Sequence, residues 1–270
     1  MCKEDNVVFH LVDPSQHVCC TKIAKAMKNT SSIILSFAFS LFFALPAFTQ
    51  NWKSWGPGVK GEGPVVRKEV KVAPFKALEL AISGNVYLRE GKRQSVEVES
   101  HKNIIEVLST DVMQDAWKIH FSRRVRGYQK FNIYITIPEL HRATVSGSGN
   151  IRGDTPFNWK GTVKLAVSGS GDIQVELHST EVDAAISGSG DITVTGTSGR
   201  LQAAISGSGN IRTGGLVVDT AAVRISGSGD CSTHPRNELE AAISGSGNVT
   251  YYGKPKVRSS ISGSGNIIPK

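Results

Sequence analysis

The feature that most constrains the fold of this 270-residue chain is a motif, Ser-Gly-Ser-Gly followed by Asn or Asp, that occurs seven times. Each copy follows a Val or Ile, and the six-residue segments begin at positions 145, 167, 186, 205, 225, 243 and 261. The longest interval, from 145 to 167, is 22 residues, and the shortest, from 243 to 261, is 18 residues. A repeat with a nearly fixed period of this length is typical of a solenoid. Because one unit is too short to bury a core alone, each unit must stack on its neighbours.

The residues around each motif follow the pattern of β-strands. Apolar residues alternate with others before the motif, as in Val182-Ala184-Ile186 and Leu201-Ala203-Ile205. Another apolar residue follows each motif directly: Ile151, Ile173, Ile192, Ile211, Cys231, Val249 and Ile267. A period of two indicates a strand with one buried face, and no helical spacing occurs in the repeats. Each coil is therefore predicted to contain a strand, a Gly-rich stretch and a second short strand.

The glycines of the motif have a structural interpretation. If the alternation continues through residues 205–211, Gly207 and Gly209 point inward, and Ser206, Ser208 and Asn210 point outward. Gly is required where two chain segments approach too closely for a Cβ atom, or where φ is positive. The sequence does not distinguish these two reasons, but both make the motif a structural joint.

The last position of the motif is predicted to stack into a ladder along the coils. Its members are Asn150, Asp172, Asp191, Asn210, Asp230, Asn248 and Asn266. Stacked Asn side chains form hydrogen bonds along such a ladder. Asp172 and Asp191 would be like charges on adjacent strands about 4.8 Å apart, which requires water, backbone N–H groups or a bridging cation. Calcium-binding β-rolls have a nonapeptide period, about half the period found here, so we predict no metal site.

Together these patterns predict an all-β fold, a parallel β-helix or solenoid with coils of about 19 residues that carry SGSG[ND] motifs over residues 145–270. Right-handed winding is the default for parallel crossovers. Residues 67–144 are predicted to form less regular coils at the start of the same stack, because "KALELAISGNVYL" at 76–88 contains a shortened motif. The 63 residues from Ile82 to Val145 would hold about three coils. Strands are expected at 95–99, 117–121 and 131–137, and a short helix or a loop at 103–112.

The N-terminal residues resemble an export signal. Lys22, Lys25 and Lys28 precede an apolar run at residues 31–48, which predicts a signal peptide at 27–49, cleaved near Thr49. An uncleaved membrane anchor is the alternative. A start at Met27 would give this signal ordinary proportions, so residues 1–26 are interpreted as a non-native upstream extension. The Gly- and Pro-rich residues 50–66 are predicted to be a flexible lead.

Cysteine use agrees with a fold held by packing alone. Three of the four cysteines lie in residues 1–26, and the predicted mature chain keeps only Cys231. A disulfide framework is therefore not expected, although the predicted destination is oxidising.

Three groups of segments resemble a known family. They are "FKALELAISGNVYLREG", "IYITIPELHRATVSGSGNI" and the series of SGSG[ND]I repeats. Over roughly residues 65–267 they resemble the putative auto-transporter adhesin, head GIN domain family, a family of exported bacterial proteins. The resemblance implies an all-β, helix-like stack and a location in the periplasm, at the cell surface or outside the cell. It supplies no active-site residues.

No pattern of catalytic, cofactor-binding or metal-binding residues is recognised. The Gly-x-Gly strings precede no helix, as a dinucleotide site would require, and the serines lack a strand–helix elbow. The histidines share no metal-ligand spacing: His101, His120, His141, His178 and His234. We therefore predict a non-enzymatic protein without cofactors. Parallel β-helices also carry polysaccharide-active enzymes that use clustered Asp or basic residues on one face, so such an enzyme is an alternative. Asp172, Asp191 and Asp230, however, belong to the predicted structural ladder.

The main functional hypothesis is an exported, adhesin-like binding module of the cell envelope or surface, whose extended ligand is a glycan or a surface protein. Candidate stacking platforms are Trp117, Trp159, Tyr251 and Tyr252, although these side chains could instead cap the stack or cover loops. The sequence does not identify ligand-binding residues. A purely structural envelope component is another alternative.

Association state and net charge are also predicted from the sequence. The mature chain is expected to be monomeric or weakly associating, without a stable membrane span. The net charge is +8, with one local basic cluster, Arg123, Arg124, Arg126 and Lys130. Because no nucleic-acid-binding module accompanies this cluster, it is interpreted as a solvated loop, and nucleic acid is not expected to be a partner.

Overall fold

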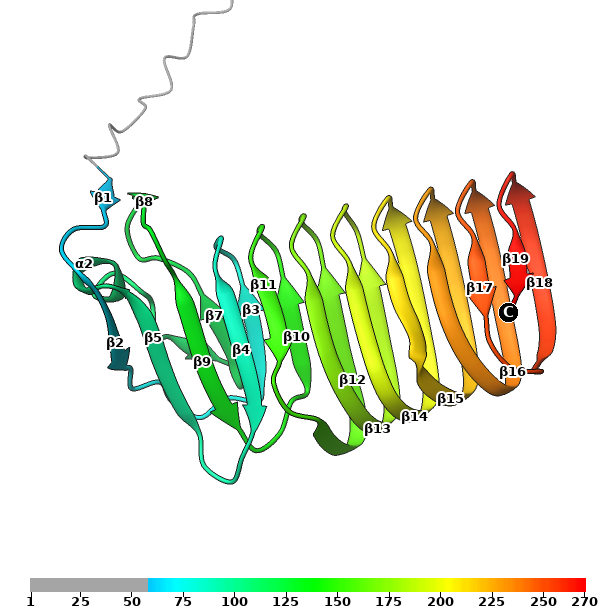
Figure 1. Ribbon diagram of the computed structural model, residues 1–270, viewed down its shortest axis with the longest axis horizontal. Coiled ribbons are helices and arrows are strands. Elements are labelled where there is room, and N and C mark those ends of the chain that lie inside the picture. Colours follow the sequence, from blue (N-terminus) through cyan, green and yellow to red (C-terminus); the bar gives the residue numbers. More distant parts are fainter. Residues whose placement is uncertain (1–57) are drawn as a thin grey trace, which may run out of the picture. The chain divides into compact units, whose positions relative to one another are not determined.

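The computed structural model describes residues 58–270, and in this part the chain is a stack of β coils (Figure 1). The only helix among these residues is α2 (Lys102–Ile105), within the segment expected to hold a short helix or a loop. The all-β fold and the stacked parallel coils are confirmed. The described residues contain no helix of the length and apolarity needed to cross a membrane. The predicted extension at 1–26 and signal peptide at 27–49 lie outside the described residues.

The regular coils are built from long strands, and all but the first of these run from one motif to the next. These strands are β12 (Phe157–Val167), β13 (Ile173–Ile186), β14 (Ile192–Gly207), β15 (Ile211–Gly227) and β16 (Cys231–Gly245). Neighbouring strands pair in parallel, and Ile205 is in register with Ile186 on one side and Ile225 on the other. The second short strand of one coil and the first strand of the next, predicted as separate elements, are therefore continuous in these coils.

The core lies between the two walls of the coils and consists of columns of like residues. The residue before each motif forms one column, in which Val167, Ile186, Ile205, Ile225 and Ile243 are buried. The residue after each motif forms a second column, which Cys231 joins between Ile211 and Val249. Burial raises the pKa of the Cys231 thiol to about 12, so this side chain serves as a small apolar core residue.

The coils of the first half do not stack in the order in which they occur along the sequence. The strands β3 (Ala77–Leu80) and β4 (Asn85–Glu90) pair directly with β10 (Arg142–Val145) and β11 (Asn150–Gly153), so that Leu80 is in register with Val145. On their other side they pair with β7 (Ala116–Ile119) and β9 (Asn132–Ile137). The prediction of about three successive coils between Ile82 and Val145 was wrong. The residues between β4 and β10 instead form the outer end of the stack, on the side of β3 and β4 that faces away from β10 and β11.

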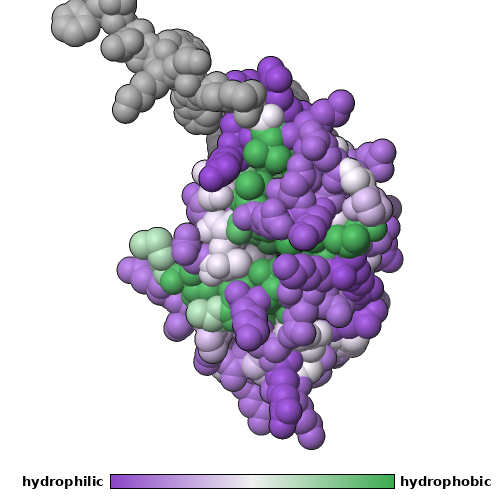
Figure 2. Space-filling view, turned by 90° about the vertical axis from the view of Figure 1, so that its left-hand side faces the viewer, coloured by the Kyte–Doolittle hydropathy of each residue, from purple (hydrophilic) through white to green (hydrophobic). Residues whose placement is uncertain are grey.

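The outer end of the stack is closed by antiparallel pairing. The strand β5 (Ser95–His101) lies antiparallel to β9 and to β2 (Val65–Glu69), and β6 (Val112–Met113) lies antiparallel to β7. Figure 2 faces this end and shows a band of apolar surface between hydrophilic regions. Partly buried side chains that pack against the core include Val66, Val70 and Val72. We name this antiparallel end the cap.

Part of the predicted flexible lead is ordered. Within residues 50–66, β1 (Val59–Lys60) pairs with β8 (Val125–Gly127), and β2 begins at Val65. The backbone N–H of Val59 donates to the carbonyl oxygen of Arg124 at 2.8 Å. Because these partners are distant in sequence, the local Gly- and Pro-rich composition did not reveal the pairing. Residues 50–57 lie outside the described part.

The opposite end of the stack is an open edge. After β17 (Val249–Tyr251), the last coil contains β18 (Lys256–Gly263) and β19 (Ile267–Pro269). Ile261 continues the column of Ile243 but is 45% exposed, because no further coil among residues 58–270 covers it. Lys256, Arg258 and Pro269 lie on this edge, and such residues discourage the addition of further strands.

Candidate functional site

Both glycines of the motif lie where neighbouring backbones approach too closely for a Cβ atom, and Gly207 also has a positive φ. A Cβ atom on Gly209 would lie 2.1 Å from the carbonyl oxygen of Gly190 in the neighbouring coil. Gly207 has a φ of 151°, and a Cβ atom on it would lie 2.4 Å from the carbonyl oxygen of Gly188. The backbone N–H of Gly209 also donates to the Gly188 oxygen at 3.1 Å. The geometry therefore supports the interpretation of the motif as a joint in which the backbones of successive coils are in contact.

The Asn/Asp ladder is longer than the motif itself suggests. Asn150 Nδ2 donates to Asn85 Oδ1 at 3.2 Å, and Asn85 Nδ2 donates to Asn132 Oδ1 at 3.2 Å. Further along, the backbone N–H of each member donates to the side-chain oxygen of the member before it, as Asp191 does to Asp172 at 2.9 Å. The two adjacent carboxylates, Asp172 and Asp191, thus each accept a hydrogen bond from a backbone N–H group. Among residues 58–270, no three His, Cys, Asp or Glu side chains are grouped so that they could hold a metal ion.

Asp191 is the most strongly bonded carboxylate of the ladder. It accepts hydrogen bonds from the backbone N–H and Nδ2 of Asn210, both at 2.9 Å, and from Arg212 at 2.6 Å. Burial acts to raise the pKa of Asp191, but the hydrogen bonds from Arg212 and Asn210 and the positive charge of Arg212 together hold this pKa below its ordinary value. A carboxyl group with a lowered pKa stabilises the folded state above the unfolded pKa of about 3.9.

We expect Asp191→Asn to lower the free energy of unfolding by about 1 kcal/mol at pH 7, because the charged partner of Arg212 is lost. The difference from the wild type should shrink as the pH falls through the folded-state pKa of Asp191, where the wild-type carboxylate is protonated. Urea titrations between pH 7 and about pH 3 measure this difference. The matched control is Asp230→Asn, at a ladder position for which no arginine partner occurs in the described residues. A constant difference across this pH range would contradict the prediction.

A long, shallow groove runs along the outside of the regular coils, next to the motif turns. One side is a column of small residues interrupted once by an arginine, and the other side is a column of motif serines. The groove has a volume of about 640 Å³. The columns are Ala166, Ala185, Ala204, Arg224, Ala242 and Ser260, and Ser168, Ser187, Ser206, Ser226, Ser244 and Ser262. We name this feature the Ala/Ser groove.

The Ala/Ser groove repeats similar chemistry from coil to coil, with a serine at every step and an alanine at most of them. Ala204 is in register with Ala185 on one side and with Arg224 on the other, and the serines Ser206 and Ser226 are in register with each other. Six strands at a spacing of about 4.8 Å make the groove about 24 Å long. Four of the six steps present an alanine methyl group beside a serine hydroxyl, and Arg224 or Ser260 replaces the alanine at the other two, so the surface suits a long ligand better than a compact one.

The aromatic residues singled out from the sequence do not line this groove. Trp117 is fully buried in the core, and its Nε1 donates to the carbonyl oxygen of Ser109 at 3.0 Å, so its interpretation as a stacking platform was wrong. Trp159 packs against His141, with ring centroids 4.4 Å apart, and Tyr252 lies 5.8 Å from the ring of His234. These side chains cover neighbouring structure, as the alternative interpretation held.

The other candidate residues from the sequence are also dispersed. In the basic cluster, Lys130 forms an ion pair with Glu99 at 2.8 Å. His101 is buried, and its Nδ1 lies 2.8 Å from the carbonyl oxygen of Gly63. Asp172, Asp191 and Asp230, the acidic residues of the enzyme alternative, are all members of the ladder. No catalytic arrangement is found among the residues that the structure describes.

This fold and its repeats match a known protein family. The family model of the putative auto-transporter adhesin, head GIN domain, matches residues 74–255, which include β3 and β4, the cap apart from β2, and the regular coils as far as β17. The chain belongs to this family. The match excludes the last coil but contains most of the Ala/Ser groove. No curated protein matches this head GIN domain chain.

Solved structures share the head GIN domain fold. A putative adhesin from Bacteroides fragilis is 22% identical with a TM-score of 0.73, and covers 79% of this chain and 100% of its own. A putative adhesin from Parabacteroides distasonis is 26% identical with a TM-score of 0.66, with the same two coverages. A putative lipid binding protein from the same organism is 23% identical with a TM-score of 0.66, again with 79% and 100% coverage. At such identities the likeness to the first and third establishes the fold alone.

Proposed function

We propose that this head GIN domain protein is an exported, non-enzymatic binding module of the cell envelope or surface, which holds an extended glycan or surface protein along the Ala/Ser groove. The observation that carries this proposal is the groove itself. It crosses six coils, is lined by columns of mostly small residues, of Val or Ile, and of Ser, and presents an alanine and a serine at four of its six steps. A ligand that repeats its own units can occupy several equivalent positions at once.

The chemistry of the groove favours a ligand with both apolar and hydroxyl-rich surfaces. The alanine methyl groups offer apolar contacts, and the serine hydroxyls both donate and accept hydrogen bonds. The family name and the names of the related structures, which include adhesins, support a binding role. The structural-component alternative predicts that the groove binds nothing, and the enzyme alternative predicts release of product from a polysaccharide.

The test is to fill the groove without disturbing the coil. Ala204→Arg places a long side chain in the groove, and Arg224 shows that the column accommodates arginine at the register position next to it. Ala222→Arg is the matched control, because Ala222 lies on the same strand face between Gln202 and Glu240 but outside the groove. The purified protein is applied to an array of immobilised glycans and to whole bacterial surface proteins.

We expect the wild type and Ala222→Arg to bind the same extended ligand, and Ala204→Arg to bind it at least about tenfold more weakly, a loss of about 1.4 kcal/mol. Equal binding by both variants would place the ligand elsewhere. No binding by the wild type would favour the structural component, and release of shorter sugars from a polysaccharide would favour the enzyme.

A further inference from the structure

A second hollow lies across the motif turns from the Ala/Ser groove, on the strands that follow each turn. It has a volume of about 270 Å³ and is formed by β4, β11 and β13. Its lining residues are Asn85, Val86, Tyr87, Asn150, Ile151, Arg152, Asp172 and Gln174. We name it the Tyr87 pocket. Its volume is below the range of about 300–1,000 Å³ for sites of drug-sized ligands, so it suits one small ring.

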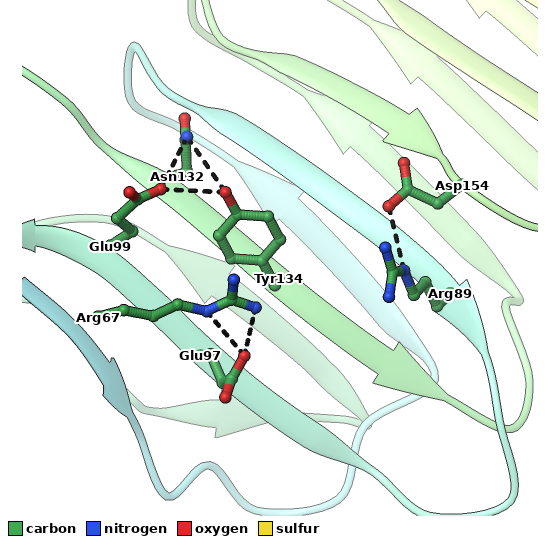
Figure 3. A network of polar contacts seen from close by, with 7 residues as sticks. All are labelled: Arg67, Arg89, Glu97, Glu99, Asn132, Tyr134 and Asp154. Atoms are coloured by element: carbon green, nitrogen blue, oxygen red, sulfur yellow. Dashed lines mark hydrogen bonds and ion pairs between the residues drawn. The ribbon is translucent and has the colours of Figure 1, made fainter.

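The aromatic side of this pocket is held rigidly. Tyr87 is in register with Tyr134, and the two rings are stacked with centroids 5.1 Å apart and planes 14° apart. The Arg67 guanidinium lies 3.9 Å from the centroid of the Tyr134 ring, and its Nε donates to Glu97 at 2.9 Å (Figure 3). The Tyr134 hydroxyl donates to Glu99 at 3.0 Å. Tyr134 therefore acts as a fixed support for the Tyr87 ring.

The other neighbour of Tyr87 leaves room for a ligand. On that side Tyr87 is in register with Arg152, which is in turn in register with Gln174. Tyr134 supports one face of the Tyr87 ring, so the ring's other face is directed along the stack toward the Arg152 column. Both Arg152 and Gln174 are exposed. A ligand ring in the pocket would thus contact an aromatic face and the two long polar side chains.

The pocket contains hydrogen-bond donors and acceptors that are available to a ligand. No side-chain hydrogen bond or ion pair within residues 58–270 involves Arg152 or Gln174, whereas Arg89 on the next strand pairs with Asp154 at 3.1 Å (Figure 3). Asp172 accepts the backbone N–H of Asp191 through Oδ1 alone. The guanidinium and amide supply donors, and the amide oxygen and the second carboxylate oxygen supply acceptors.

We propose that the Tyr87 pocket binds a single pyranose residue of a glycan. A pyranose ring has an apolar C–H face, which packs on an aromatic ring, and hydroxyls around its edge, which both donate and accept hydrogen bonds. Tyr87 supplies the aromatic face, and Arg152, Gln174 and Asp172 supply partners for the hydroxyls. This proposal is independent of the Ala/Ser groove, because the two features share no residue.

Saturation-transfer NMR tests the proposal with the methyl pyranosides of glucose, galactose and mannose and with N-acetylglucosamine. We expect transfer to the ring protons of at least one sugar. Tyr87→Ala should weaken its binding at least about tenfold, Tyr87→Phe should retain it because the ring is kept, and Arg152→Gln should weaken it several-fold. Ala222→Arg, outside both the pocket and the Ala/Ser groove, is the control and should bind normally, as should Tyr251→Ala, which removes a tyrosine that packs against the core far along the stack.

Three results would overturn the proposal: no transfer to any of the sugars, wild-type binding by Tyr87→Ala, or equal transfer to every variant. Should Tyr87→Ala fail to fold, Arg152→Gln decides the matter, because Arg152 is exposed and its loss removes no bond within the described chain. Loss of groove binding in Ala204→Arg with normal sugar binding would show that the two sites are separate.

Discussion

Replacing Gly209 by Val should lower the free energy of unfolding by about 3 kcal/mol. The reason is the 2.1 Å separation between the position of a Cβ atom on Gly209 and the carbonyl oxygen of Gly190, which is backbone and cannot move independently. The Cγ2 atom of Ile186 would lie 2.9 Å from the same Cβ position. Because repeats depend on their nearest neighbours, the damage should extend to the adjacent coils. Thermal melts and amide hydrogen exchange measure the loss and its extent.

The matched control is Ser208→Ala, one residue earlier in the same motif. Ser208 is exposed, and no side-chain hydrogen bond is found for it within residues 58–270, so its replacement should cost well under about 1 kcal/mol. A silent Gly209→Val combined with a Ser208→Ala variant that loses ligand binding at an unchanged melting temperature would show that the motif is a recognition surface and not a joint.

Trp117→Ala should have the second large effect, a loss of about 4 kcal/mol in the free energy of unfolding. Trp117 is fully buried in β7, packs 5.5 Å from the ring of Phe75, and donates to the Ser109 carbonyl oxygen. Its removal leaves a cavity and an unpaired oxygen where the outermost coil meets the cap. Denaturant titrations measure the loss, and we expect hydrogen-exchange protection to fall most in β3, β6 and β7.

Trp117→Phe is the control, because it keeps most of the ring volume and loses only the Nε1 hydrogen bond, which costs about 1 kcal/mol. Trp159→Ala provides a second comparison, since Trp159 is only partly buried. If Trp117→Ala unfolded at the wild-type denaturant concentration but failed to bind a ligand, Trp117 would be a binding residue, as the sequence alone had allowed.

The regular coils were predictable because their signals are local and repeated. The alternation of apolar residues around Ile186, Ile205 and Ile225 indicates which side chains point inward, and the nearly constant spacing brings these residues into register. The inward direction of Gly209 followed from the same alternation. The positive φ of Gly207 did not follow, because a preference for Gly does not distinguish a positive φ from a close approach.

The first half was less predictable because pairing between distant segments leaves little local trace. The pattern "KALELAI" predicts a strand at β3, but it does not say that β10, far later in the chain, becomes its neighbour. Nor does alternation distinguish the antiparallel pairing of β5 with β9 from a further parallel coil. The residues facing inward were therefore recognisable, whereas the order of the coils was not.

One clue to the Tyr87 pocket was present in the sequence. The segments "NVYL" at 85–88 and "NIYI" at 132–135 share the order Asn, apolar, Tyr, apolar, and the structure places them side by side in register. Aligning them would have predicted both the extended ladder and the stacked tyrosines. The aromatic candidates named from the sequence did not include Tyr87 or Tyr134, and the burial of Trp117 depends on tertiary packing alone.

In the first half the coils do not stack in chain order, whereas in the regular coils they do. The first part is therefore fixed in length, and the second is adjustable. Each strand from β13 to β15 pairs with the strand of the coil before it and the strand of the coil after it, so a whole period can be duplicated or removed while the same kind of pairing is kept. The segment from β3 to β11 has no such freedom, because β3 and β4 are held between strands that the chain reaches only later. Gene-level gain or loss of single repeats would thus lengthen or shorten the groove by about 4.8 Å per coil while leaving the cap and the Tyr87 pocket unchanged.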